Sequence, residues 1–319
     1  MGSSSFPLIS FQKFLTGSEK EKRAVAQQLY DAFHIYGWVY LENFGISPDE
    51  VDNMFAMSKK YFDRPVEEKL KETLSSAETN QGYTPDGAEA NGGTDHKESY
   101  EHRRFKNELC PSPEHLSGFR DFMDSFYAKC FSLSIDVLRA LALIMDLDLE
   151  YFSTALEQAD PQLRLLHYMP IARSIIEADG HARIIPHTDF GLCTILFQDC
   201  VGGLEVDPFH TGAFVPATPI RGTCVINVAD LLQRLSNDRL RSTMHRVTSP
   251  LLRTVDRDGM LPARYSTAFF VHPAAHVDIE PIVREGEKAA KYEKVNAGQW
   301  RTMNTAKNYK NILADDVKV

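Results

Sequence analysis

Cysteine is scarce in this sequence, and its spacing excludes two common kinds of structural site. Only five of the 319 residues are cysteine, and no two of them form a C-x-x-C pair. An odd number of scattered cysteines indicates neither a disulfide framework nor a zinc ribbon. Because unpaired thiols persist in reducing compartments, we expect the protein to be cytoplasmic.

Long apolar runs and basic clusters are also absent. No apolar stretch approaches the roughly 20 residues that a membrane-spanning helix needs, and residues 1–10 lack the basic flank and apolar stretch of a signal peptide. The formal net charge is −9, and no run of Lys or Arg resembles a nucleic-acid-binding arm. We therefore expect neither a membrane nor a nucleic acid among the partners. Nothing in the sequence indicates an obligate partner chain, so we expect a monomer.

The first part of the chain, residues 1–110, has the pattern of helices with one short strand. Apolar residues recur at helical spacing in residues 20–36 and 48–62, and residues 38–41 resemble a short buried strand. A longer helix, rich in apolar residues, is expected at 114–146. We do not expect the first part to be an independent domain.

From Gln162 onward the pattern changes to short apolar runs separated by turn residues. Strands of this length and spacing are typical of a β-sandwich, barrel or jelly roll. The expected strands are Arg164–Tyr168, Ile184–His187, Cys193–Phe197, Gly203–Val206, Thr223–Asn227, His245–Thr248 and Arg264–His272. The second part, 111–319, would thus hold the support helix, a β core over about 160–280 and a C-terminal helix at 285–312. We predict a mainly β fold with flanking helices, in which both parts form one structural unit.

Residues between Gln81 and Arg104 break the helical pattern. The residues that mark this stretch as an irregular loop are Gly82, Pro85, Gly87, Gly92 and Gly93. Long loops of this kind often act as lids over active sites, and others are solvated connections. Both interpretations stay open at this point.

The sharpest local motif is Pro186-His187-Thr188-Asp189. Side chains two apart in a strand project to the same face, so His187 and Asp189 would present an imidazole and a carboxylate side by side. His245 lies 58 positions beyond His187 (245 − 187) at the start of another expected strand, and it is the best third ligand. Two His and one carboxylate form the facial triad of non-haem Fe(II) oxygenases, which leaves positions open for a cosubstrate and O₂. A hydrolytic zinc site could use the same three ligands.

A second motif is the expected strand that starts at Arg264. Strand alternation puts Arg264, Ser266 and Phe270 on one face, toward the inside of the barrel. A guanidinium buried there carries a large desolvation cost unless an anion meets it. The planar fork of Arg264 matches a carboxylate, and Ser266 adds a hydroxyl donor. The anion is either an internal Asp or Glu or a small dicarboxylate cosubstrate.

With these residues in hand, the chain resembles the isopenicillin N synthase-like family of 2-oxoglutarate/Fe(II)-dependent dioxygenases over nearly its whole length. The motifs that carry the resemblance, in family order, are Phe6-Pro7-Leu8-Ile9-Ser10, Tyr36–Gly45, His187-Thr188-Asp189-Phe190-Gly191, Gly202–Val206, Asn227-Val228-Ala229-Asp230, Ser236–Leu240, Ser242–Val247 and the Arg264/Ser266 strand ending at His272-Pro273. Several motifs in the right order are far more specific than any one of them.

The resemblance implies a double-stranded β-helix, or jelly-roll, fold. It implies that His187, Asp189 and His245 are the iron ligands and the catalytic centre. It also implies that Arg264 and Ser266 hold the far carboxylate of 2-oxoglutarate.

Further positions follow from the same resemblance. Tyr168 matches the last aromatic of the family's N-Y-Y-P segment and would also contact 2-oxoglutarate, although Leu166 stands where many members have Asn. Phe270 matches a position that often lines the substrate pocket. We expect Phe190 and Tyr83 to contact the substrate as well.

The function that the resemblance implies is the oxidation of a C–H bond in a small molecule of the specialised-metabolite kind, by hydroxylation, desaturation or ring formation. Fe(II), 2-oxoglutarate and O₂ would be required, with ascorbate as a candidate reductant, and succinate and CO₂ would be released. Two alternatives stay open. One is a 2-oxoglutarate-independent Fe(II) oxidase of the same fold, acting on an amino acid or peptide whose carboxylate meets Arg264. The other is a non-catalytic protein that binds a small molecule on the same scaffold.

Overall fold

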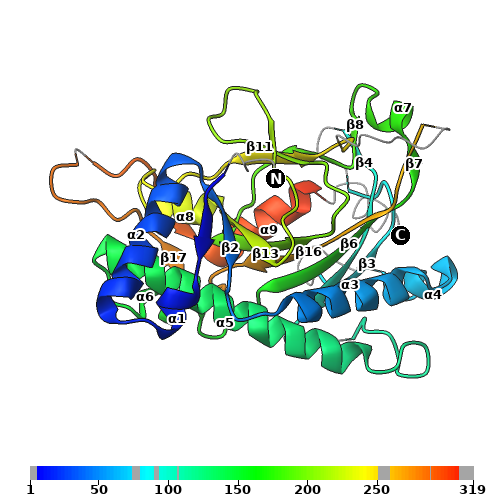
Figure 1. Ribbon diagram of the computed structural model, residues 1–319, viewed down its shortest axis with the longest axis horizontal. Coiled ribbons are helices and arrows are strands. Elements are labelled where there is room, and N and C mark those ends of the chain that lie inside the picture. The colour runs from blue at the N-terminus through cyan, green and yellow to red at the C-terminus, as the bar shows by residue number, and fades with distance from the viewer. Residues whose placement is uncertain are drawn as a thin grey trace.

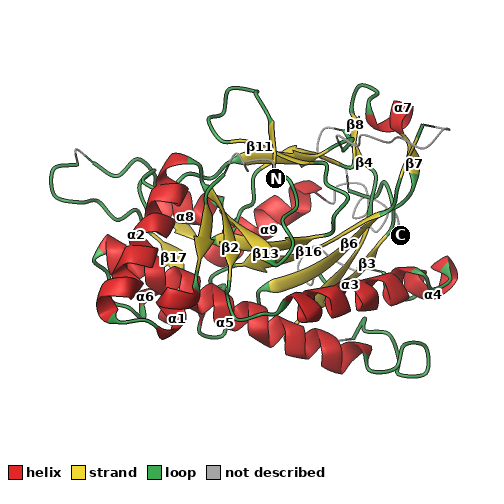
Figure 2. Ribbon diagram, viewed as in Figure 1, coloured by secondary structure: helices red, strands yellow, loops and turns green. Residues whose placement is uncertain are grey.

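The computed structural model describes residues 6–73, 80–89, 93–105, 108–250, 259–287 and 289–308. Its centre is a pair of sheets that face each other, with helices packed against the outer face of the larger one (Figure 1). Over the described residues, the larger sheet has eight strands and the smaller one has four. Two facing, mostly antiparallel sheets with helices on the outside form the predicted mainly β jelly roll (Figure 2).

The large sheet combines strands from both parts of the chain. Its order is β1 (Leu8–Ser10), β2 (Trp38–Glu42), β13 (Thr223–Val228), β10 (Cys193–Gln198), β16 (Arg264–Val271), β6 (Gln162–Tyr168), β5 (Glu98–Arg103) and β3 (Gly82–Thr84). Residues 162–271 supply the four central strands, and the first 110 residues supply both edges. The early region is therefore part of the same sheet as the β core.

The small sheet lies across the molecule from the centre of the large one (Figure 1). Its order is β12 (Val215–Pro216), β11 (Leu204–Asp207), β14 (Met244–Val247) and β9 (Ile184–His187). Three two-stranded pairs complete the β structure of the described residues: β7 (Ile171–Ala172) with β15 (Met260–Leu261), β17 (Asp278–Ile279) with β18 (Val295–Asn296), and β4 (Thr94–Asp95) with β8 (His181–Ala182).

Helices cover the outer face of the large sheet, where α3 and α5 lie beneath β6, β10 and β16 (Figure 1). The helices are α1 (Gln12–Thr16), α2 (Glu19–Ile35), α3 (Pro48–Phe62), α4 (Val66–Leu70), α5 (Phe119–Met145), α6 (Tyr151–Leu156), α7 (Arg173–Ile176), α8 (Asp230–Leu235) and α9 (Ala297–Asn308). The helix predicted at 48–62 is confirmed. It begins at a capping box in which the Ser47 hydroxyl accepts from the Glu50 backbone N–H and the Glu50 carboxylate accepts from the Ser47 backbone N–H.

The helix predicted at 285–312 is wrong in its first part, because α9 begins only at Ala297. Residues before it form a turn, in which Gly286 has a φ of 91° and the Glu287 backbone N–H donates to the Arg284 carbonyl, and then the strand β18. A positive φ ends helical geometry and suits glycine. Residues 309–312 lie outside the described part of the chain.

The irregular loop expected over residues 81–104 is also partly wrong, since β5 occupies Glu98–Arg103 and pairs along its whole length with β6. All six residues of β5 are buried, although its side chains are mostly polar or charged. Burial is tolerated because partners are close: the carboxylate of Glu98 accepts from the Lys69 amine at 2.6 Å and from the Tyr83 hydroxyl at 2.6 Å. A strand rich in paired charges carries no apolar alternation, and so the sequence pattern does not reveal it.

Strand β16 has one face toward a cavity and the other toward the hydrophobic core, as its alternation predicts. The side chains of Arg264, Ser266 and Phe270 line a cavity between the sheets. On the other face, Phe269 belongs to the main hydrophobic core, and its ring meets that of Tyr127 on α5 edge-on at 5.0 Å. One strand thus joins the polar interior to the apolar layer that holds the helices.

This packing predicts a large stability loss for Phe269→Ala. The ring is completely buried, so its removal leaves a cavity between β16 and α5. We expect the free energy of unfolding to fall by about 3–5 kcal/mol, measured by urea denaturation. The control is Phe105→Ala, because Phe105 is 60% exposed and its loss should change stability by only about 0.5 kcal/mol. Equal unfolding midpoints for both variants would contradict this account of the core.

Candidate metal centre

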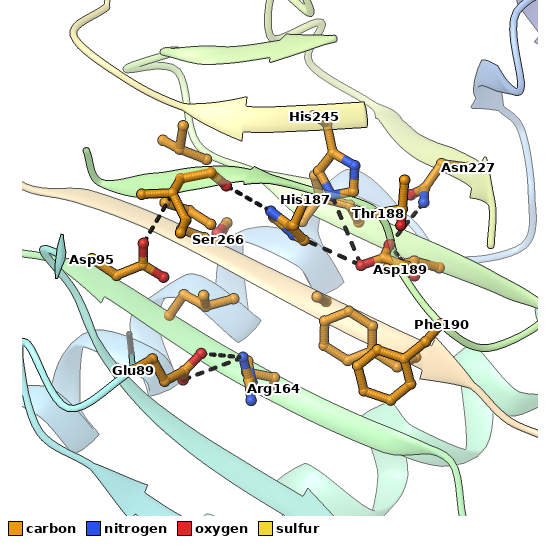
Figure 3. A pocket seen from close by; sticks show the side chains of 18 of the residues that line it. Glu89, Asp95, Arg164, His187, Thr188, Asp189, Phe190, Asn227, His245 and Ser266 are labelled. Atoms are coloured by element: carbon orange, nitrogen blue, oxygen red, sulfur yellow. Dashed lines mark hydrogen bonds and ion pairs between the residues drawn. The ribbon is translucent and has the colours of Figure 1, made fainter. Parts of the chain in front are cut away.

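His187 and His245 lie directly opposite each other on two paired strands. They are register partners in the antiparallel pair β9–β14, and their ring centres are 4.2 Å apart. Asp189 follows two residues after His187, so its side chain reaches the same place (Figure 3). Its Oδ1 lies 3.9 Å from His187 Nε2 and 3.8 Å from His245 Nε2. The three predicted ligands therefore converge on one point from two distant segments.

Hydrogen bonds to the backbone fix the orientation of both imidazoles. His187 Nδ1 lies 2.9 Å from the Ile185 carbonyl oxygen, and His245 Nδ1 lies 3.2 Å from the Thr243 carbonyl oxygen. A carbonyl can only accept, so each Nδ1 carries the proton and donates it. Each Nε2 is then left with a free lone pair that faces the carboxylate of Asp189. This is the tautomer that binds a metal ion through Nε2.

The carboxylate of Asp189 is held in place by its other oxygen. Oδ2 accepts from the Thr194 hydroxyl at 2.6 Å and from the Asn227 amide at 2.8 Å, which leaves Oδ1 toward the imidazoles. Burial favours the neutral acid, but the imidazoles of His245 and His187 and these two donors outweigh it, and the pKa of Asp189 is lowered. The group is therefore an anion in a buried site.

The donor set fits a divalent metal ion. Burial lowers the pKa of His245 to about 4, and the neighbouring His187 adds to this effect. The His245 imidazole is therefore neutral near neutral pH. The ligand atoms of the three residues all lie within 4.8 Å of one another, yet Asp189 Oδ1 is too far from either Nε2 to form a hydrogen bond. Two imidazole nitrogens and one anionic oxygen around such a gap are the donors that non-haem Fe(II) prefers.

The start of α8 ties the two ligand-bearing segments together. The backbone N–H of Asp230 donates to the carbonyl of Asp189 at 2.8 Å. The Asp230 carboxylate accepts from the hydroxyls of Ser242 at 2.7 Å and Thr188 at 3.2 Å. Ser242 precedes His245 by three residues, and Thr188 lies between the other two ligands. Asp230 therefore connects all three ligands through neighbouring residues.

Arg264 is buried behind the three predicted metal ligands, with 1% of its surface exposed. Its Nη1 donates to the Ser266 hydroxyl at 3.2 Å and its Nη2 to the Gln198 side-chain oxygen at 3.4 Å. Its guanidinium lies 4.7 Å from the centre of the Tyr168 ring. Among the described residues no carboxylate lies within ion-pair distance of it. The internal Asp or Glu partner that the sequence left open is therefore not found there.

A second buried cation, Arg183, was not predicted from the sequence. It is fully buried, donates to the Pro262 carbonyl at 2.5 Å, and lies 5.8 Å from the centre of the same Tyr168 ring. Burial and the nearby Arg264 lower its pKa to about 10. Arg183 stands at a bend between β8 and β9, where strand parity does not apply, so no pattern in the sequence identified it. Two buried guanidiniums around one tyrosine require an anion.

The cavity between the two sheets has a volume of about 410 Å³, a size typical of small-molecule sites. Phe270 and Phe190, both predicted to contact the substrate, line it. Tyr83 is not among the described residues that line it, because its hydroxyl donates to Glu98 and its ring lies beneath the amine of Lys69. The sequence-based expectation for Tyr83 therefore has no support from its position.

The end of the cavity away from Arg264 contains charged and amide side chains that were not predicted. Those described are Asn80, Glu89, Asp95, Lys97, Gln162 and Arg164. Figure 3 shows Glu89 facing Arg164, with which it forms an ion pair at 3.5 Å. Three of these residues belong to the segment interpreted as either a lid or a solvated connection. Their contact with the cavity favours the lid.

Helix α9 closes one side of the cavity. The indole N–H of Trp300 donates to the carbonyl of Phe190 at 2.9 Å, and Asn304, Thr305 and Lys307 line the cavity. The C-terminal helix is thereby attached next to the metal ligands. In the described part of the chain, no helix is both long and apolar enough to cross a bilayer.

Two family models match the chain. Residues 6–124 match the N-terminal region described as non-haem dioxygenase in morphine synthesis, and residues 160–273 match the 2OG-Fe(II) oxygenase superfamily. The second match contains His187, Asp189, His245, Arg264 and Ser266. Both halves of the fold are therefore covered.

Curated relatives align over nearly the full length of the chain. The 2-oxoglutarate-dependent dioxygenase ecdK of Aspergillus rugulosus is 33% identical over 93% of this chain and 97% of its own. The proline hydroxylase buaE of Petromyces alliaceus is 35% identical over 94% of this chain and 98% of its own. Such coverage extends the similarity well beyond the metal-binding motifs.

Solved structures agree in fold and in sequence. A full-length Neurospora crassa protein in complex with alpha-KG and thymine is 36% identical, with a TM-score of 0.88 over 95% of this chain and 97% of that one. The same protein in complex with alpha-KG alone is 37% identical, with a TM-score of 0.87 over 94% and 96%. The chain thus belongs to the 2OG-Fe(II) oxygenase superfamily and is an Fe(II)- and 2-oxoglutarate-dependent dioxygenase.

Proposed function

We propose that His187, Asp189 and His245 bind the Fe(II), and that Arg264, Ser266 and Tyr168 hold the far carboxylate of 2-oxoglutarate. Phe270 and Phe190 then contact a small organic substrate whose C–H bond is oxidised beside the metal. The observation that carries this proposal is the buried charge of Arg264, which has no carboxylate partner among the described residues, behind three convergent donor groups. A dicarboxylate is the ligand that meets both at once.

When bound, Fe(II) with 2-oxoglutarate and O₂ supplies the oxidising power, and the keto acid leaves as succinate and CO₂. The protein supplies position. The fork of Arg264 and the Ser266 hydroxyl fix one end of the cosubstrate, and the Tyr168 ring packs against that guanidinium. Thr194 and Asn227 keep one oxygen of Asp189 occupied, so that the other stays directed at the metal.

Apolar side chains around the centre exclude water from it. The Trp38 ring lies 5.5 Å from that of His245, and Leu196, Leu204 and Val247 line the cavity nearby. A dry site strengthens the interactions between charged groups. It also keeps the oxidation directed at a bound C–H bond, by hydroxylation, desaturation or ring formation.

The comparisons favour the 2-oxoglutarate-dependent reaction over both alternatives. The relatives above are named as a 2-oxoglutarate-dependent dioxygenase and a hydroxylase, and the Neurospora crassa protein was solved with alpha-KG. No observation singles out a 2-oxoglutarate-independent oxidase or a silent binding protein. We infer a small-molecule substrate of the specialised-metabolite kind, and a monomeric cytoplasmic protein that binds no nucleic acid. Free thiols, which include the buried Cys130, Cys193 and Cys224, fit that compartment.

The decisive experiment is an O₂-uptake assay with Fe(II), 2-oxoglutarate and ascorbate across a panel of small molecules. We expect succinate to form in a one-to-one ratio with oxidised substrate. Oxidation of a substrate without succinate would support the oxidase instead. Fe(II) binding with no O₂ uptake on any candidate would support the binding protein.

Removal of one ligand tests the metal assignment. Asp189→Ala removes the only anionic donor of the three, so we expect Fe(II) affinity to fall by more than the roughly 10–100-fold typical of a supporting residue, and turnover to disappear. Anaerobic Fe(II) titration measures the affinity. The control Asp52→Ala removes a carboxylate that is 58% exposed and should leave both unchanged. Full oxidation by Asp189→Ala would mean that the metal lies elsewhere.

Arg264→Lys tests the cosubstrate site. Lysine keeps the charge but loses the planar fork, and the loss of one charge-assisted hydrogen bond should raise the KM for 2-oxoglutarate by roughly 10-fold or more. The KM for the oxidised substrate should change little. Arg246→Lys is the matched control, because this arginine pairs with Glu205 on the small sheet away from the cavity. An unchanged KM for 2-oxoglutarate in Arg264→Lys would exclude this residue from the cosubstrate site.

A further inference from the structure

Arg183 is a buried cation close to the proposed cosubstrate site that makes no contact with the cavity. Its side chain is completely buried, and it is not among the described residues that line the cavity. Its Nη2 donates to the Pro262 carbonyl at 2.5 Å. Among the described residues, Nε and Nη1 have no hydrogen-bond partner. The hydrogen bond to Pro262 therefore leaves most of the guanidinium N–H groups unused.

No acid compensates the charge of Arg183 directly. Within the described part of the chain, no carboxylate lies at ion-pair distance from it. The acid with an effect on its charge is Asp199, and this effect is smaller than the opposing one of Arg264. The Asp199 oxygens already accept from the backbone N–H groups of Val201 at 3.0 Å and Tyr265 at 2.6 Å. With its pKa lowered to about 10, chiefly by burial, Arg183 remains a cation near neutral pH.

The Tyr168 ring limits the distance between the two buried cations. The guanidinium of Arg183 lies 5.8 Å from the ring centre, and that of Arg264 lies 4.7 Å from it. The two charges are therefore at most about 10 Å apart. At that distance, with an effective dielectric constant of about 20, a charge changes the affinity for an anion by roughly 10-fold. An anion that meets Arg264 is thus attracted by Arg183 as well.

The hydrogen bond to Pro262 offers a different explanation, in which Arg183 is only a structural clamp. Pro262 precedes Arg264 by two residues, so this hydrogen bond fixes the start of β16. A clamp needs one N–H donor and no charge. Glutamine would serve that purpose without the cost of burying a cation. An arginine with no acid beside it therefore favours a role for the charge itself.

We propose that Arg183 is a positioning residue that strengthens the binding of the far carboxylate of 2-oxoglutarate through its charge, without touching it. Arg264 and Ser266 form the hydrogen bonds, and Arg183 adds positive potential behind them. In this role it favours a dicarboxylate over a 2-oxo acid with an uncharged tail. The proposal rests on the proposed function, because 2-oxoglutarate is taken as the anion that meets Arg264.

The test compares 2-oxoglutarate with 2-oxopentanoate, which has the same carbon chain and keto acid but no far carboxylate. Isothermal titration calorimetry is run anaerobically on the full chain with Fe(II), so that binding is measured and not turnover. Arg183→Gln keeps a donor for Pro262 and loses the charge. We expect it to bind 2-oxoglutarate roughly 10-fold more weakly than the wild type, with an unchanged affinity for 2-oxopentanoate. An unchanged affinity for 2-oxoglutarate, or an equal loss for both keto acids, would overturn the proposal.

Arg183→Lys provides the rescue. Lysine restores the charge but not the planar fork, so the affinity for 2-oxoglutarate should return to near the wild-type value. A clamp would instead make the lysine and glutamine variants alike, and that result would also overturn the proposal. Arg239→Gln is the matched control and should leave both affinities unchanged. Arg239 also donates to a backbone carbonyl, that of Ile282 at 3.0 Å, but it already has the carboxylate of Glu287 at 2.8 Å.

Urea denaturation of the unliganded protein gives a second readout. A buried cation without an acid beside it destabilises the unliganded fold. We therefore expect Arg183→Gln to unfold at the same urea concentration as the wild type or at a higher one. Added 2-oxoglutarate should raise the midpoint less in this variant than in the wild type. A clear fall in the midpoint of the unliganded variant would identify Arg183 as a clamp.

The outcome separates this proposal from the assignment of the cosubstrate. A wild type that binds 2-oxoglutarate no better than 2-oxopentanoate would remove the proposed cosubstrate site itself. A wild-type preference for 2-oxoglutarate that Arg183→Gln retains in full would leave that site standing and remove only the role of Arg183.

Discussion

The pairing of β9 with β14 is the constraint on which the site depends. It sets His187 directly opposite His245, since partners in an antiparallel pair share one face of the sheet. Asp189 continues the alternation of the first strand by one further step. Backbone carbonyls then direct each Nδ1 away from the centre, so that both Nε2 atoms face one oxygen. The geometry of the candidate metal site thus follows from strand register and not from a flexible loop.

The large sheet provides the complementary half of the cavity, and its register separates two chemical environments. Arg264 pairs across β16 and β6 with Tyr168, whereas Phe270 on the same strand pairs with Gln162. Arg264 and Phe270 are six positions apart on β16. The first is a buried cation, and the second lies beside Gln162, whose side-chain amide is neutral.

Both ends also hold polar groups that the protein itself leaves incompletely satisfied. The guanidinium nitrogens of Arg183 and Arg264 and the amides of Asn80 and Gln162 include buried atoms with no hydrogen-bond partner among the described residues. The apolar contacts on the other face, such as Phe269 against α5, offset the cost of this interior. The main apolar core lies on the helix side of the large sheet, and the cavity lies on the side that faces β9 and β14.

Local alternation was enough to predict the β strands of the core, the shared direction of His187 and Asp189, and the inward direction of Arg264, because side-chain direction in a strand depends only on parity. It could not reveal that β5, with its paired charges, joins the large sheet, or that Tyr83 turns toward Glu98. Nor could it bring Asn80 to Gln162, which lie 82 residues apart. Those contacts arise from strand pairing between distant segments, and only the tertiary structure decides which segments pair.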